Sequence, residues 1–519
     1  MALPSMNRAP TQFDPETDLP AGFMSFFRPL HHLFTPRQQQ LIRHRAEVLN
    51  DAHRGRLPKH LPPSAAATSD WKIQLPEWAQ DQRNQMTGPA DDGELVVKML
   101  NSGAPGVMID LEDSMANDWS ALMRGVENTI RAHYGELSYV DKKRNQTFTI
   151  KPSKTVLFTR SRGLHLSQGG IFPNNEITSA SLFDVALIAY QLDPTRLTHP
   201  ICFYIPKSES AEEALWWNDL FKAIEKAKRL ATGSIKCMAL VESHPLAFQI
   251  EEFIYNLRDH LIGMNLGRWD YMASLIHFLY TDPDWVLPDR NTIPHNIPFF
   301  QNLRLLIPKI CHTRGLLAIG GMTALYPSRI DLELNERALR VLAEDKKNEA
   351  SCYMDGAWTG HPDQNQIALA QFPFPNQLAQ LAPAVPRYPD LRPAVVGVGK
   401  RTVNGTRAAI RTVIRYRAGY LNGKGASLLD GYMEDLATDR IYRLMIAQRM
   451  KHRGRVEIFD ETGKAIRHTP EFITKLFDEE LTKVIAEQPC GTDTASIEPF
   501  RRAREISEEM IRSEAFSPI

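Results

Sequence analysis

Three carboxylates stand close together at the end of an apolar run, in the stretch GVMIDLEDSMANDW at residues 106–119. Asp110, Glu112 and Asp113 lie within four positions of one another. Carboxylates this close raise one another's pKa unless a cation or hydrogen-bond donors compensate. The cluster is therefore either solvated or arranged beside positive charge, and the second arrangement could do chemistry.

Charged side chains follow other apolar runs in the same way. Several carboxylates with an arginine and a lysine suit a hard divalent cation, Mg²⁺ or Mn²⁺, that holds an anionic substrate through its oxygens. No histidine or cysteine group has the spacing of a zinc site. Taken singly, each residue could equally cap a helix or carry a surface charge, whereas a shared position at strand ends favours one site. The candidates are Asp110, Glu112, Asp113, Arg160, Arg162, Lys207, Glu242, Asp270 and Asp355.

The elements that would position these residues alternate from residue 94 onward. Segments of helical period follow short apolar runs, most clearly at residues 210–230 and 246–261. Continuous apolar strands, each followed by a helix, predict a parallel sheet covered on both faces. Seven such units without a G-x-G-x-x-G turn favour a TIM (β/α)8 barrel over a doubly wound sheet. The predicted strands are VMID (107–110), TVLFTR (155–160), ICFYIP (201–206), IKCMALVE (235–242), LIGMNL (261–266), LLAIGG (316–321) and GAWTG (356–360).

Three further regions flank the predicted barrel of residues 94–370. Residues 1–93 are rich in Pro, Gln, Arg and His and are predicted to form an extension with one helix over Pro36–Ala52. Residues 371–393 are rich in proline and are expected to form a mobile connector. Residues 394–519 are predicted to form a helical domain. Its helices are expected at Val403–Leu421, Asp435–His452, Thr469–Glu487 and Ile497–Ser513.

The composition excludes several classes of partner. The 519 residues are 43% hydrophobic and include 61 basic and 61 acidic side chains, so no net field attracts nucleic acid or an anionic membrane. The longest apolar runs fall far short of the roughly 20 residues that span a bilayer, and no signal peptide is recognisable. Five cysteines without a CxxC pair suit a reducing compartment. We therefore expect a cytoplasmic protein, a monomer or small homo-oligomer, without nucleic-acid or membrane partners.

The chain resembles the malate synthase family, in its shorter form A, from about Trp71 to the C-terminus. The matching stretches occur in the family's order, and GRWDY and MED are specific enough to exclude a chance match. The resemblance implies a TIM barrel with an N-terminal helical clasp and a C-terminal helical plug that closes over the barrel mouth. It also implies an acyltransferase that condenses acetyl-CoA with glyoxylate and water to give malate and CoA, using Mg²⁺. The stretches are VMIDLEDS, TRSRGLHL, IKCMALVESHPLAFQIEEFIYNLRDHLIGMNLGRWDYMAS, HTRGLLAIGGMTALYPS, DGAWTGHP and GYMEDLAT.

The family's roles, carried onto matching positions, imply two metal ligands and two catalytic residues. Glu242 in LVES and Asp270 in GRWD match the ligands of Mg²⁺, and two carboxylates leave room for substrate oxygens and water. Arg160 in TRSRG matches an arginine beside the oxygen that becomes negative, where a fixed cation stabilises an enolate or alkoxide. Asp435 in MED matches the base that removes a proton from the thioester methyl group. The alternative for Asp435 is a simple N-cap of the following helix.

The same resemblance implies supporting roles near the metal. Glu112 and Asp113 are expected to accept hydrogen bonds from waters bound to Mg²⁺. That cation would then stabilise the cluster of carboxylates after the apolar run. Loop amides around Leu266, Gly267 and Arg268 are expected to donate to the carboxylate of the oxo acid.

Several positions depart from the family's usual pattern and leave the substrate open. They are Leu111, Leu266, Ala357, Thr359-Gly360 and Arg440. One alternative is therefore a malate-synthase-like enzyme that condenses, cleaves or hydrolyses a different pair of acyl-CoA and 2-oxo acid. A non-catalytic binding protein on the same scaffold would have lost a metal ligand or the base, and neither is missing.

Positive charges for the phosphates of coenzyme A are harder to choose from the sequence. Arg162, Lys207 and the basic residues of the C-terminal region are candidates. Each of them is equally well interpreted as a plain surface charge.

Overall fold

Eight parallel strands close into a barrel in the computed structural model, which describes residues 7–294, 296–380, 386–395, 397–488 and 494–516. The order around the barrel is β10-β11-β12-β13-β2-β3-β6-β9. This confirms the predicted TIM barrel and all seven predicted strands. The strands are β2 (Asn84–Pro89), β3 (Gly106–Asp110), β6 (Val156–Arg160), β9 (Cys202–Ile205), β10 (Lys236–Val241), β11 (Leu261–Leu266), β12 (Leu317–Met322) and β13 (Gly356–Thr359).

The first strand of the barrel, β2, is missing from the predicted set. Its sequence NQMTGP begins with two amides and ends in Gly-Pro, which reads as a loop rather than a buried strand. The amides are nevertheless buried because neighbours satisfy them: Asn84 Nδ2 donates to Asn365 Oδ1 at 2.7 Å, and Thr359 Oγ1 donates to Asn84 Oδ1 at 3.0 Å. The boundary predicted at residue 94 is therefore wrong, since the barrel begins at Asn84.

Helices follow the strands and cover the outside of the barrel. Side-chain N-caps begin several of them, which satisfies amides that a first helical turn leaves open. The capping residues are Asp92, Asp118, Ser179, Ser210 and Asp331. The helices are α3 (Gly93–Leu100), α4 (Trp119–His133), α5 (Ala180–Gln191), α6 (Ala211–Ala227), α7 (Ile250–Asn256), α8 (Arg268–Phe278), α9 (Pro298–Arg314), α10 (Leu332–Ser351) and α11 (Asn365–Leu369).

Short elements complete the barrel region. A hairpin of β4 (Ser138–Asp141) and β5 (Gln146–Thr149) projects from it, and β1 (Asn7–Arg8) joins β7 (Ser167–Gly169) and β8 (Thr178–Ser179) in a small sheet. Single helical turns are α2 (Ala65–Thr68) and the 3-10 segments Glu77–Ala79, Pro173–Asn175, Pro194–Arg196, Leu246–Phe248, Pro283–Trp285, Arg290–Thr292 and Pro362–Gln364.

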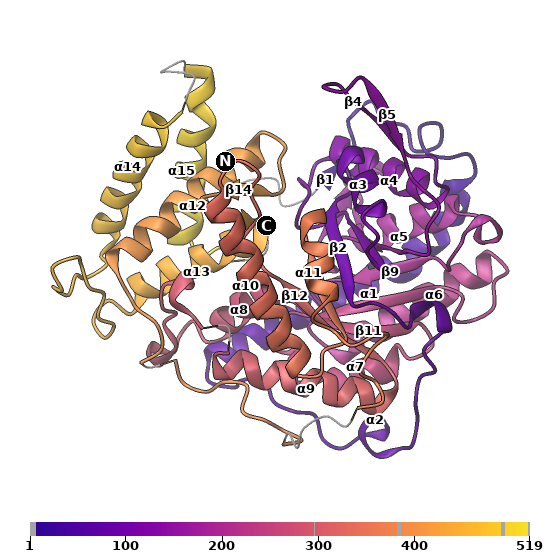
Figure 1. Cartoon of the computed structure of the whole chain (residues 1–519), viewed down its shortest axis with the longest axis horizontal. Helices are drawn as coiled ribbons and strands as arrows, with labels where there is room; N and C mark the ends of the chain where they lie inside the picture. The colour runs from indigo at the N-terminus through magenta and orange to yellow at the C-terminus, as the bar shows by residue number, and fades with distance from the viewer. Residues whose placement is uncertain (1–6, 295, 381–385, 396, 489–493, 517–519) are drawn as a thin grey trace.

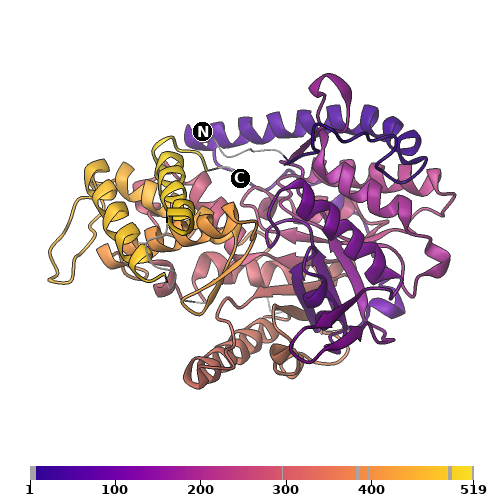
Figure 2. The same cartoon turned by 90° about the horizontal axis from the view of Figure 1, so that it is seen from above.

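The N-terminal helix α1 (Phe23–His53) begins earlier than the predicted Pro36–Ala52. The prolines at positions 29 and 36 argue against a helix when the sequence is considered alone. In the structure, the buried Phe23 and Phe27 stack on each other and pack against Phe183 of α5, which stabilises the early turns. Figure 2 shows α1 lying along the barrel and reaching toward the C-terminal domain. The helix therefore has the position expected of a clasp.

The C-terminal domain stands beside the barrel, and its helices are the light-orange to yellow group at the left of Figure 1. The tight contact at Gly425 joins the two parts, because a Cβ there would lie 2.2 Å from the Met115 backbone. Close by, the Asn117 amide donates to Tyr420 Oη at 3.1 Å. The predicted helices are all present, with an added hairpin. The elements are α12 (Val403–Leu421), β14 (Ser427–Leu429), β15 (Tyr432–Glu434), α13 (Leu436–Lys451), α14 (Pro470–Ala486) and α15 (Thr494–Arg512).

The connector predicted at residues 371–393 is in part firmly attached to the barrel. Gln377 is buried, its amide donates to Asp355 Oδ1 at 2.7 Å, and its side chain donates to Met354 O at 2.6 Å. Residues 381–385 lie outside the described part. Among the helices of the described ranges, none is both long and apolar enough to cross a bilayer.

Candidate active site

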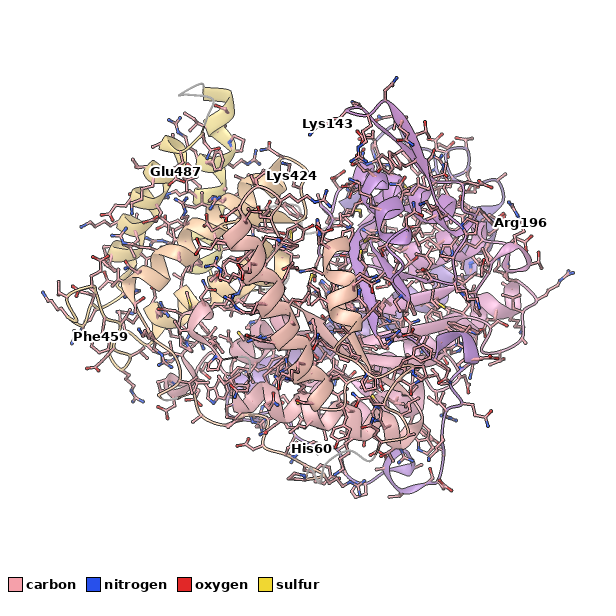
Figure 3. All side chains as sticks on the ribbon, in the orientation of Figure 1. His60, Lys143, Arg196, Lys424, Phe459 and Glu487 are labelled. Carbon is pink, nitrogen blue, oxygen red and sulfur yellow. The ribbon has the colours of Figure 1, made fainter. Side chains whose placement is uncertain are left out.

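A cavity of about 240 Å³ lies where the carboxyl ends of the barrel strands meet the C-terminal domain. Barrel residues that the sequence singled out line it together with a carboxylate from the other domain. The charged lining residues are Asp110, Asp113, Arg160, Glu242, Arg268, Asp270 and Asp435. Figure 3 labels Lys143, Arg196 and Glu487 at the periphery of the molecule, whereas these seven charges lie at the junction of the two domains.

Arg160 is held by a two-pronged ion pair at the end of β6. Its Nε and Nη2 donate to the two oxygens of Asp110, both at 2.6 Å. Asp110 also accepts the amides of Glu112 and Ser114 at 2.9 Å each. Although burial opposes the charge, Asp110 holds the pKa of Arg160 well above its usual value. The guanidinium is therefore a fixed cation, with Nη1 facing Glu112 and Asp113 at 3.7 and 3.8 Å.

Lys207 follows β9 and lies inside the carboxylate cluster. Its Nζ is 3.0 Å from Glu112 Oε2, 2.5 Å from Asp113 Oδ2 and 3.3 Å from Asp270 Oδ2. Its own amide donates to Glu242 Oε1 at 2.7 Å. The backbone φ of Lys207 is +47°, a conformation that costs a non-glycine residue about 1 kcal/mol or more. From the sequence, Lys207 was interpreted as either a coenzyme A contact or a plain surface charge. The surface-charge interpretation is wrong, because the side chain is buried.

Three buried carboxyl groups of the site hold protons more tightly than usual. Burial raises the pKa of Glu112 to about 8, although Lys207 lies beside it. Burial also raises the pKa of Glu242, and it raises that of Asp270 well above its usual value. These shifts are typical of a site that is built to receive more positive charge than the chain itself supplies.

Asp435 reaches the cavity from the first turn of α13. It is the N-cap of that helix, since its Oδ1 accepts the Thr438 amide at 3.2 Å and its own amide donates to Thr438 Oγ1 at 3.0 Å. The preceding Glu434 is fixed by Arg290, whose Nη1 donates to it at 2.7 and 3.0 Å. Burial, with Asp113 as the next cause, raises the pKa of Asp435 to about 7. Asp435 is thus both the cap that the alternative expected and a carboxyl group of the cavity.

The surroundings of Glu242 and Asp270 fit a small hard cation. Both side chains are buried and line the cavity, and among the described residues Asp270 Oδ1 has no hydrogen-bond partner. A side chain at Gly267 would lie 2.5 Å from Glu242 Oε2, so the glycine makes room for that carboxylate. Within the same part of the chain, no three His, Cys, Asp or Glu side chains are arranged to hold a metal by themselves. Any ion here would complete its shell with water and substrate oxygens, as Mg²⁺ usually does.

Of the three residues whose amides are expected to receive an anion, Leu266 and Gly267 lie at the end of β11 and Arg268 begins α8. Leu266 is the last residue of β11, and the Gly267 amide donates to Val241 O at 3.2 Å, so this amide is already used within the barrel. Helix α8 begins at Arg268 without a side-chain cap. The amides of its first turn, at Trp269 and Asp270, therefore point out of the helix beside the cavity, an arrangement that favours anions.

Two other predicted residues have structural roles. Arg162 is buried in a paired contact with Asp184 of α5, with Nη2 at 2.7 Å from Oδ1 and the backbone amide at 2.9 Å from Oδ2. It is therefore not available as a coenzyme A contact. Asp355 precedes β13 instead of following a strand, and its Oδ2 accepts from the Ala318 amide at 2.7 Å. It lies at the opposite end of the barrel, so its assignment to the site is wrong.

The sequence did not reveal the polar floor of the site. Inside the barrel, Gln85 Oε1 accepts from Tyr204 Oη at 2.9 Å and from Trp358 Nε1 at 3.1 Å. The Trp358 ring lies 5.6 Å below the Arg160 guanidinium. These side chains come from three strands that are distant in sequence. The sequence indicated only that Tyr204 and Trp358 lie within predicted strands, and it did not indicate that they meet Gln85. The floor fixes the ring that supports Arg160.

The closed parallel barrel, with acidic residues and a fixed arginine at its mouth and a carboxylate delivered by a second domain, defines a two-domain TIM-barrel enzyme. Comparison with known proteins is consistent with this class. A family model described as "Malate synthase, TIM barrel domain" matches residues 156–384, and a model described as "Malate synthase, C-terminal" matches residues 400–518. The chain belongs to the malate synthase family and is an acyltransferase.

Individual relatives extend the similarity over nearly the whole chain. Malate synthase A of Escherichia coli (strain K12) is 35% identical over 507 residues, which cover 96% of this chain and 93% of the relative. The glyoxysomal malate synthase of Zea mays is 33% identical over 498 residues, 93% of this chain and 87% of the relative. A solved pyruvate/acetyl-CoA ternary complex of Haloferax volcanii malate synthase has a TM-score of 0.50 at 16% identity, over 72% of this chain and 92% of that one. The structural match supports the fold.

Proposed function

We propose that the chain catalyses the Mg²⁺-dependent condensation of acetyl-CoA with glyoxylate and water to give malate and CoA. The observation that carries this proposal is the shared cavity, in which Arg160, Glu242 and Asp270 of the barrel face Asp435 of the C-terminal domain. A carbon–carbon bond formed next to a thioester needs a base for the methyl proton and positive charge for the resulting enolate. The two domains supply one each.

Glu242 and Asp270 would hold the metal. Bound there, Mg²⁺ supplies Lewis-acid polarisation of the glyoxylate aldehyde and fixes its orientation. Mn²⁺ accepts the same oxygen ligands and is expected to substitute. The first-turn amides of α8 at Trp269 and Asp270 lie beside the cavity and would receive the glyoxylate carboxylate.

Asp435 is the proposed base. With a pKa raised to about 7, it is a stronger proton acceptor than an ordinary aspartate and is still largely ionised just above neutral pH. Its backbone is fixed as the cap of α13, which limits the positions that its carboxylate can take. These two properties together suit removal of a proton from a methyl group held in the cavity.

Arg160 is proposed to stabilise the enolate and then the alkoxide. Its two bonds to Asp110 leave Nη1 directed toward the cluster, so the positive charge is in place before the reaction begins. Because Asp110 holds its pKa well above the usual value, Arg160 is unsuited to accept a proton. Glu112 and Asp113 are proposed to accept hydrogen bonds from waters on the metal.

Most of the positions that depart from the family's pattern do not line the cavity, although Arg440 interacts electrostatically with Asp270, Asp113 and Glu242. Leu111, Leu266, Ala357 and Thr359 are buried in the wall, and of the departing positions Gly360 is the one among the described lining residues. The observation favours the substrates of the family over a different pair of acyl-CoA and oxo acid. Four cysteines of the described part are free and buried, which supports the proposed cytoplasmic location.

The test is to mix the protein with Mg²⁺, acetyl-CoA and glyoxylate and to follow free thiol, with malate identified by chromatography. We expect thiol release that depends on glyoxylate and stops when EDTA removes the metal. Parallel reactions with pyruvate and with propionyl-CoA measure the substrate preference. Thiol release no faster than in the control without glyoxylate would rule the proposed function out.

A further inference from the structure

The Lys207 ammonium occupies the place where the carboxylates of the site converge. It lies within 3.3 Å of oxygens from Glu112, Asp113 and Asp270, which come from the end of β3 and the start of α8. The Lys207 side chain is 8% exposed, and those of Glu112 and Asp113 are each 3% exposed, so water is a limited substitute for the contacts among them. One flexible cation thus compensates three acidic groups.

The backbone of Lys207 is attached to the same site by a separate contact. Its amide donates to Glu242 Oε1 at 2.7 Å, and the residue is kept at a φ of +47°. Through its amide and its ammonium, Lys207 therefore contacts both Glu242 and Asp270. These are the two residues proposed above to hold Mg²⁺.

We propose that Lys207 is the built-in counter-ion of the metal-free site, and that a divalent cation binds by displacing its ammonium from Asp270. This inference rests on the proposed metal site. After the exchange, Glu112 and Asp113 still pair with the Lys207 ammonium, whereas Asp270 binds the metal. The lysine thereby prevents an uncompensated acidic cluster before metal binding, and it makes that binding weaker than the carboxylates alone would allow.

Electrostatics and side-chain flexibility make this exchange feasible for Lys207. A doubly charged ion on Asp270 repels an ammonium 3.3 Å from the same carboxylate, and the repulsion is strong in a buried site. The four-carbon stem of a lysine lets its ammonium move without moving the backbone. Arg160 has no such freedom, because two of its nitrogens are bonded to Asp110.

Lys207→Met tests the exchange, since it removes the charge and keeps a side chain of similar length. Metal-free protein is titrated with Mg²⁺ in a calorimeter, and its melting temperature is measured in EDTA and in saturating Mg²⁺. We expect the variant to bind Mg²⁺ about tenfold or more tightly than the parent, because a repelling charge has gone. We also expect it to melt at a lower temperature than the parent in EDTA, with most of the difference removed by Mg²⁺. Lys207→Gln is a second neutral variant with the same expectation.

Two controls separate loss of the counter-ion from loss of any lysine or of any packing. Lys98→Met removes an exposed lysine of α3 that pairs with Glu94, and it should change neither measurement. Lys207→Arg keeps the charge and should leave Mg²⁺ affinity near that of the parent. Mg²⁺ binding by Lys207→Met or Lys207→Gln that equals or falls below the parent's would overturn the exchange while leaving the metal site intact. A parent that binds no Mg²⁺ would overturn the exchange and the ligand assignment together.

Discussion

The two walls of the cavity are built in opposite ways. The barrel wall holds several buried charges that contact one another, with Asp110 fixing Arg160 and Lys207 joining three other carboxylates. Among the lining residues that the structure describes, the C-terminal domain contributes one ionisable group, Asp435, at the cap of a helix. In the proposed mechanism, this difference assigns cation binding and charge stabilisation to the barrel and proton removal to the other domain. Substitutions in the two walls should therefore change different measurable quantities.

The largest effect is expected from Asp435→Asn, which changes the C-terminal wall alone. Asparagine caps a helix as well as aspartate does but cannot accept the methyl proton. We expect kcat to fall by about 10² to 10⁴, the range for loss of general-base catalysis, while Mg²⁺ affinity and melting temperature stay near those of the parent. Steady-state kinetics and calorimetry measure both. Turnover at the parental rate would leave Asp435 as a cap and nothing more.

Asp270→Asn should have the next largest effect, and the quantity that it should change is the affinity for Mg²⁺. A neutral amide replaces one of the two charged ligands proposed for the metal. Loss of a residue that only hydrogen-bonds to a metal ligand typically weakens metal binding by about 10- to 100-fold. We therefore expect loss of a ligand's charge to weaken Mg²⁺ binding by about 100-fold or more. Titration of activity and of heat release with Mg²⁺ measures the change. An unaltered Mg²⁺ requirement in this variant would show that another group holds the metal.

A pH profile compares the two walls in the unmodified protein. The base must be ionised to accept a proton, so protonation of Asp435 below its pKa of about 7 should lower the rate about tenfold for each pH unit. Bound Mg²⁺ favours the ionised carboxylate, which makes 7 an upper limit for the midpoint under saturating metal. The profile is measured as kcat at saturating Mg²⁺ from pH 8.5 to 5. A rate that stays constant over this range would show that the pKa of the base lies below 5, and not at about 7 as that of Asp435 does in the metal-free protein.

The smallest effect is expected from Thr438→Ala, which separates the two roles of Asp435. The change removes the hydroxyl that accepts the Asp435 amide, but it leaves the carboxylate in the cavity. We expect a loss of about 1 kcal/mol in the free energy of unfolding and a turnover within about tenfold of the parent's. Denaturant unfolding and steady-state kinetics provide the two values. A collapse of turnover comparable to that of Asp435→Asn would mean that cap geometry, and not the carboxylate alone, controls the chemistry.

Much of the fold follows from local patterns in the sequence. Seven strands were predictable because buried parallel strands consist of continuous apolar residues. The strand β2 was not, since Asn84 and Gln85 are buried through partners contributed by residues 204, 358, 359 and 365, and no local pattern encodes such partners. The same limit explains α1, whose early turns are stabilised by packing on α5 in spite of two internal prolines.

The site was predictable where the identity of a residue fixes its role and not where distant partners decide it. Glu242, Asp270, Arg160 and Asp435 meet in one cavity as the sequence resemblance implied, although their chemical roles stay predictions. Lys207 pairs with carboxylates more than 60 residues away in either direction, so its burial could not be read from its neighbours.

The closure of the barrel constrains how the chain is synthesised and folded. The last strand, β13, pairs with the first, β2, at Ala357 and Asn84. During synthesis β2 therefore has an unpaired edge until most of the barrel has left the ribosome, which exposes it to wrong pairings. Asp435 is made later still, so a chain that ends before α13 contains every barrel strand and yet lacks the second wall of the cavity. Synthesis of the barrel strands and of the residue that completes the cavity are therefore separate in time.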